Sequence, residues 1–104
     1  MNNLKLKKDL TAIQTLIYTM LQYKKKSDWN GIYWIVMGTW QAVEGTIKYM
    51  NLLNPLDFTQ SDEDNLQDLN LLDNLFDIIC NEQLFIIPEN MPVLLEKIAD
   101  RLIA

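Results

Sequence analysis

Hydrophobic residues recur at intervals of three and four along most of this chain, which is the spacing of one face of an α-helix. The pattern predicts helices at about 4–24, 29–53, 62–81 and 91–103. Residues 83–88 form a run too short for a helix and predict a buried extended connector. We therefore expect an all-α protein in which residues 1–104 form a single-domain compact bundle of about four main helices.

Residues that favour helix ends mark several of the boundaries. Ser61 with Asp64 three residues later resembles a capping box and predicts the start of the third helix. A proline pushes the residue before it out of helical geometry, so Asn54 before Pro55 should end the second helix. Pro92 suits the first turn of the fourth helix, where its missing N–H costs nothing.

The second segment holds all three glycines of the chain, Gly31, Gly38 and Gly45, at intervals of seven residues. This spacing places them on one face of a helix. A glycine inside a helix costs roughly 1 kcal/mol relative to alanine. We therefore expect another backbone or a bulky ring to lie close against the glycine face.

The same segment has a second interpretation. The Asn-Gly pair at 30–31 is typical of a hairpin turn, and the residues that follow have high β propensity. A short strand at 32–37, followed by a shorter helix from Gln41, is therefore the alternative to one long helix.

Charge is distributed unevenly along the chain. Residues 1–54 carry seven lysines and three acidic residues, whereas residues 55–104 carry two basic and eleven acidic residues. No basic residue occurs between Lys48 and Lys97. A surface of this kind repels nucleic acid and favours encounter with a basic partner. The alternative is a solvated acidic face that binds nothing.

Seven carboxylates of the third helix and the loop before it form the expected contact surface. They are Asp57, Asp62, Glu63, Asp64, Asp68, Asp73 and Asp77. Asp68 differs from the others because it projects toward the apolar side of the helix. It should either reach solvent near the helix start or meet a lysine from the first helix or from a partner.

The chain offers few groups for catalysis. It contains no histidine, which removes the commonest general base and metal ligand. Its one cysteine, Cys80, lies in a hydrophobic run and is interpreted as a small buried apolar residue. Asp73 and Asp77, or the acids at 62–64, offer oxygen ligands for Mg²⁺ or Ca²⁺, but a helix cap is a sufficient explanation for the second group. We expect no enzyme activity, no cofactor and no metal site.

Nucleic-acid and membrane binding are also disfavoured. Trp29, Tyr33 and Trp40 lie near the lysines at 24–26, a combination that single-strand binders use, but these rings have core spacing. The longest uncharged runs are shorter than the roughly 20 residues that cross a bilayer. Because the first ten residues lack the features of a signal peptide, a cytoplasmic location is expected.

These observations favour a small acidic inhibitor that masks a basic site on a partner protein by stoichiometric binding. In size and charge it is similar in character to the immunity proteins, antitoxins and nuclease inhibitors that act on basic nucleases or toxins. No residue role follows from that likeness. The alternative is a structural homo-oligomer, such as a homodimer, that packs through the Gly31, Gly38 and Gly45 face or through the third helix.

Overall fold

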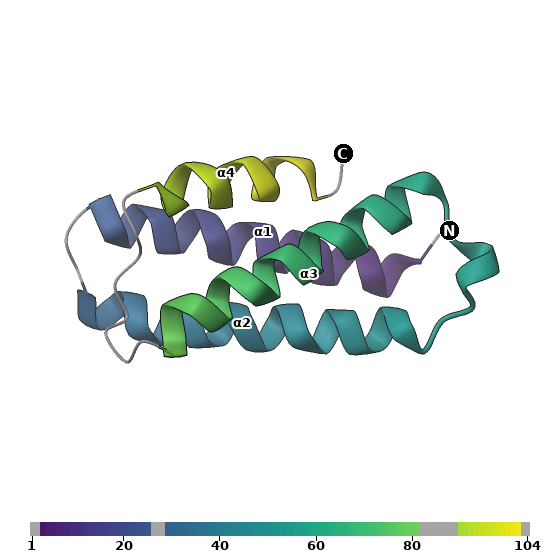
Figure 1. The fold of residues 1–104 in the computed structure, drawn as a ribbon, viewed down its shortest axis with the longest axis horizontal. Helices are drawn as coiled ribbons and strands as arrows, with labels where there is room; N and C mark the ends of the chain where they lie inside the picture. The colour runs from purple at the N-terminus through teal and green to yellow at the C-terminus, as the bar shows by residue number, and fades with distance from the viewer. Residues whose placement is uncertain (1–2, 26–28, 82–89, 103–104) are drawn as a thin grey trace.

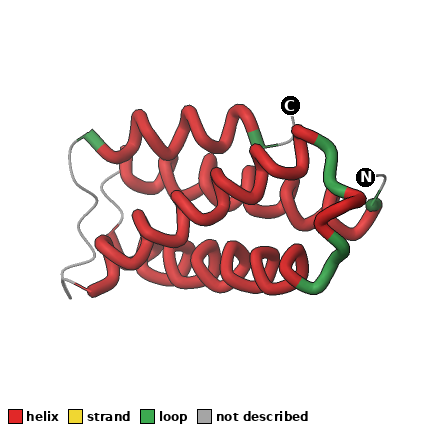
Figure 2. Tube along the Cα trace, turned by 45° about the vertical axis from the view of Figure 1, so that its right-hand side comes forward, coloured by secondary structure: helices red, strands yellow, loops and turns green. Residues whose placement is uncertain are grey.

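The computed structural model describes residues 3–25, 29–81 and 90–102, which form four α-helices and one short 3₁₀ turn (Figure 1). The elements in chain order are α1 (Leu4–Lys25), α2 (Trp29–Asn51), η1 (Pro55–Asp57), α3 (Gln60–Asn81) and α4 (Met91–Arg101). No strand occurs in these described ranges, which Figure 2 shows as helix and loop alone. The all-α bundle is therefore confirmed.

Successive helices run in opposite directions in an elongated bundle of 43 × 23 × 21 Å (Figure 1). α1 packs against α2 on one side and α4 on the other, and α3 packs against α2 with a smaller contact to α4. No described helix is long and apolar enough to cross a membrane.

One hydrophobic core runs through the bundle. It is formed by the buried stripe of each helix, which repeats at three and four residues. Its fully buried large side chains are Ile13, Ile17, Met20, Met50, Leu69, Leu72, Phe76, Ile79, Leu95, Ile98 and Leu102.

α4 covers only part of α1, because it has half the length of α1. Its last turn lies beside the middle of α1, where Gln14 donates a hydrogen bond to the Ala99 carbonyl at 2.7 Å and Tyr18 donates to Asp100. The N-terminal turns of α1 extend beyond the end of α4 (Figure 1). This difference in length positions the groove described below.

The strand alternative at 32–37 is wrong, because these residues belong to α2. Val36, Thr39 and Val43 are buried at helical spacing where α2 meets its neighbours. A strand would have turned alternate residues of this segment away from the core. Burial of the helical stripe therefore outweighs the local β propensity.

The expected close neighbour at the glycine face is also absent where the structure describes that face. Gly38 and Gly45 are exposed, and a Cβ atom added to either one meets no atom within 4 Å. The surroundings of Gly31 lie outside the described part of the chain. The core of the bundle contacts the opposite side of α2, so the two described glycines face solvent.

The start of α3 differs from the expected one. α3 begins at Gln60, and its capping box joins Thr59 to Asp62. The Thr59 N–H donates to Asp62 Oδ2 at 2.8 Å, and the Asp62 N–H donates to Thr59 Oγ1 at 3.2 Å. The expected pair of Ser61 and Asp64 has the same spacing two residues later in the chain. The connector expected at 83–88 lies outside the described residues.

Candidate functional site

Four of the seven candidate carboxylates are exposed. Asp57 lies on η1, Glu63 and Asp64 lie near the start of α3, and Asp77 lies near its end. Gln60 donates to Asp64 Oδ1 at 2.9 Å within the first turn of the helix. These four side chains are placed on the surface, where a partner can contact them.

Asp62 is buried and caps α3 through its two hydrogen bonds with Thr59. Burial raises the pKa of Asp62, but its hydrogen bonds to Thr59 favour the charged form and contribute to a pKa below the ordinary value. This carboxylate therefore stabilises the helix start rather than offering a contact to a partner.

Asp68 is only 9% exposed and is held by Arg101, the last residue of α4. Arg101 Nη2 donates to Oδ1 at 2.8 Å, and Arg101 Nε donates to Oδ2 at 3.0 Å. The hydrogen bond to Asp68 raises the pKa of the Arg101 guanidinium. The expectation that Asp68 reaches solvent or meets a lysine of the first helix is wrong, because the end of α4 lies beside it.

Asp73 accepts a hydrogen bond from the indole Nε1 of Trp40 at 2.7 Å. Both side chains are partly buried, and the bond joins the middle of α2 to α3. No spacing rule in the sequence predicts this pairing, because the two residues lie 33 positions apart. Asp73 therefore helps to hold α2 against α3, in addition to contributing negative charge to α3.

Two adjoining hollows lie at the N-terminal end of α3. One, of about 450 Å³, lies beside the start of α1, and the other, of about 500 Å³, lies beside Arg101 at the end of α4. They share Ser61 and Asn65, so we treat them as one groove. The lining of the groove is Asn3, Leu6, Lys7, Leu10, Thr11, Thr59, Ser61, Asp62, Asp64, Asn65, Gln67, Asp68 and Arg101. Its size is within the range of protein ligand sites.

Asn65 is the site residue that sequence reasoning missed. It is 6% exposed and continues the buried stripe of α3 that includes Leu69, Leu72 and Phe76. Its side chain has no hydrogen-bond partner among the described residues. A polar residue at a core position of the repeat is the sequence signal that could have singled it out.

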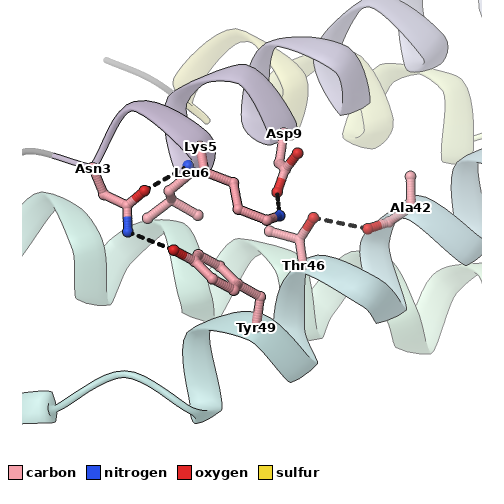
Figure 3. Close-up of polar contacts among 7 residues, drawn as sticks. All are labelled: Asn3, Lys5, Leu6, Asp9, Ala42, Thr46 and Tyr49. Carbon is pink, nitrogen blue, oxygen red and sulfur yellow. Dashed lines mark hydrogen bonds and ion pairs between the residues drawn. The ribbon is translucent and has the colours of Figure 1, made fainter.

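A second polar cluster links the start of α1 to α2 (Figure 3). Lys5 Nζ lies 2.7 Å from Asp9 Oδ2 and 4.3 Å from the centre of the Tyr49 ring. Asn3 caps α1 by accepting the Leu6 N–H at 3.0 Å, and it donates to the Tyr49 hydroxyl at 2.8 Å. These polar groups form their hydrogen bonds and ion pair with one another, so we interpret the cluster as structural.

The described residues contain no group of three or more histidine, cysteine or acidic side chains placed to hold a metal ion. Cys80 is partly buried, with its Sγ 3.8 Å from the Met37 sulfur. Burial, and then the charge of Asp77, raise the pKa of the Cys80 thiol. A raised pKa lowers the fraction of reactive thiolate at neutral pH.

Comparison with family models, with curated proteins and with solved structures finds no match for this chain.

Proposed function

We propose that this protein binds a basic partner protein through an acidic surface formed by Asp57, Glu63, Asp64 and Asp77. The observation that carries the proposal is the charge of α3. This helix contains six carboxylates and no basic residue, and three of its acids lie on the exposed face. A surface of uniform sign attracts a partner of opposite charge and speeds its encounter.

The proposed contact surface is smaller than the one expected from the sequence. Asp62, Asp68 and Asp73 support the fold through Thr59, Arg101 and Trp40, so the partner contacts the exposed carboxylates beside them. In this proposal the protein is an inhibitor without catalytic activity, of the immunity or antitoxin type. Its carboxylates occupy positions at which a basic nuclease or toxin would hold phosphate groups.

The test compares two matched charge reversals. Glu63→Lys changes the proposed surface, and Glu96→Lys makes the same change at an exposed position of α4. The partner is isolated on the immobilised protein from a lysate of the source organism, and its association rate is then measured at several salt concentrations. We expect 1:1 binding whose association rate falls with salt and with Glu63→Lys, and much less with Glu96→Lys.

Two results would contradict the proposal. One is binding that is indifferent to salt and equally affected by both reversals. The other is an isolated partner without a basic surface, because the acidic face would then serve only solubility.

A homodimer through the outer face of α2 is the second candidate, and an exposed tryptophan favours it. Trp34 is 76% exposed and packs edge to face on Tyr33, with ring centres 5.2 Å apart. The same helix leaves Gly38 and Gly45 open, which would allow a second copy of α2 to approach closely. Exposed aromatic side chains are enriched at protein interfaces.

Analytical ultracentrifugation over a wide concentration range tests the dimer. A mass that rises with concentration, and that Trp34→Gln returns to the monomer value, supports it. The control is Leu56→Gln, which removes an exposed apolar side chain from η1. A monomer at all concentrations overturns this candidate and leaves the acidic surface unaffected.

A further inference from the structure

The groove lies along the N-terminal half of α3, between the start of α1 and Arg101, the last residue of α4. The buried stripe of α3 is apolar from Leu69 onward, and it becomes polar at Asp62, Asn65 and Asp68. Asp68 lies level with the last residue of α4, as its bonds to Arg101 show. The polar part of the stripe therefore begins level with Arg101, the last residue of α4.

Asn65 is the one member of this polar part without a bond in the described chain. Asp62 is bonded to Thr59 and Asp68 to Arg101, whereas the Asn65 amide has no partner among the described residues. No described side-chain nitrogen or oxygen is both fully buried and unpartnered, so the amide reaches the groove that Asn65 lines on both sides. An amide that opens to a groove can exchange hydrogen bonds with a ligand that enters it.

The kind of side chain that lines the groove changes along its length. Leu6 and Leu10 of α1, each 3% exposed, line one end beside Lys7 and Thr11. The Asn65 amide, with one donor group and one acceptor, lies where the two hollows meet. Asp64, which is exposed, lines the other end beside the Asp68–Arg101 pair.

We infer that the groove binds an extended peptide segment that places an apolar side chain against Leu6 and Leu10, a backbone amide against Asn65, and a lysine or arginine against Asp64. A peptide amide offers the donor and acceptor that match the side-chain amide of Asn65. The carboxylate of Asp64 selects a basic side chain over an acidic one. The inference rests on the proposed function for the origin of the segment, which would belong to the basic partner.

The probe is the blocked tripeptide acetyl-Leu-Gly-Lys-amide, titrated into ¹⁵N-labelled protein and followed by NMR. We expect saturable shifts of the Asn65 side-chain NH₂ signals, and weaker binding of acetyl-Leu-Gly-Glu-amide. Asn65→Leu should weaken binding of the lysine peptide by at least about tenfold. Asn70→Leu, at an exposed position of the same helix, is the control and should bind as the original protein does.

Stability separates a binding role of Asn65 from a structural one. Because the amide has no partner within the described chain, Asn65→Leu should leave the thermal unfolding midpoint unchanged or raise it. If this variant instead unfolds at a lower temperature and still binds the peptide, Asn65 is a structural residue and the inference is overturned. Asp64→Asn should abolish the preference for the lysine peptide over the glutamate peptide. If the preference remains, Asp64 does not contact the basic side chain and this part of the inference is wrong.

Different results would overturn the peptide-binding groove and the acidic contact surface. Failure of the lysine peptide to bind the unmodified protein overturns the groove and leaves the acidic surface standing, because Glu63→Lys tests that surface with the intact partner. A peptide that binds in the groove, together with a partner indifferent to salt and to Glu63→Lys, overturns the acidic surface instead.

Discussion

The indole N–H of Trp40 donates to a carboxylate oxygen of Asp73 at 2.7 Å and joins the middle of α2 to α3. Trp40 also packs against the hydrophobic core, so its ring is apolar on one side and hydrogen-bonded at its edge. Asp73 is consequently a weaker position than Glu63 for testing the acidic surface, because a change there alters the packing of two helices as well as the charge.

Removal of this bond should destabilise the protein. We expect Asp73→Ala to lower the free energy of unfolding by about 1 to 2 kcal/mol, because the Trp40 N–H loses a charged acceptor in a partly buried place. Urea unfolding measures the change. Asn74→Ala, at the next and exposed position, should stay within about 0.5 kcal/mol of the original protein. Equal effects of the two substitutions would show that the Trp40–Asp73 bond contributes nothing.

The link between α4 and α3 gives a second prediction. Arg101→Gln should lower the free energy of unfolding by about 1 kcal/mol, since it leaves the carboxylate of Asp68 without its cation. The arginine side chain is about half exposed, so the loss should shrink at high salt. Lys97→Gln removes the same charge from an exposed position of α4 and should have a smaller effect. A cost that is the same for both variants contradicts a specific role for Arg101.

The open glycines predict stabilising substitutions. Gly38→Ala and Gly45→Ala should each raise the free energy of unfolding by up to about 1 kcal/mol, because alanine favours the helix and the added methyl group meets no neighbour. Chemical denaturation of the monomer at low concentration measures the gain. Destabilisation by Gly38→Ala would mean that another chain or segment lies against this face.

The capping pair of α3 predicts a pH dependence. The pKa of Asp62 is lowered in the folded protein from an ordinary value of 3.8, so its carboxylate contributes stability that is fully present above that value. This contribution is lost as the pH falls through the folded pKa. At pH 7, Asp62→Asn should lower the free energy of unfolding by about 1 kcal/mol.

Below about pH 4 the difference between the original protein and Asp62→Asn should become smaller, as the carboxyl group of the original protein takes up a proton. Urea unfolding at a series of pH values measures it. Glu63→Gln, at an exposed position one residue later, is the control and should show a smaller change with pH. A constant difference across this pH range would show that the charge of Asp62 has no part in capping α3.

The amino-acid sequence by itself determined the helices of the bundle. The spacing of residues such as Ile13, Val43, Phe76 and Ile98 specifies one buried stripe on each helix, and all four side chains are in the core. Periodicity is a local property, so it can be read without knowing which helices meet. The acidity of α3 follows from the sequence for the same reason, because no basic residue interrupts it.

Only the tertiary structure decided which groups are paired and which are open. Sequence spacing shows that Gly38 and Val36 lie on different faces of α2, but it does not say which face meets another helix. The partner of Asp68 depends on where α4 ends, 33 residues later in the chain. The surroundings of Asn65 are likewise set by tertiary contacts, because the hollows that it lines also take residues from α1 and α4.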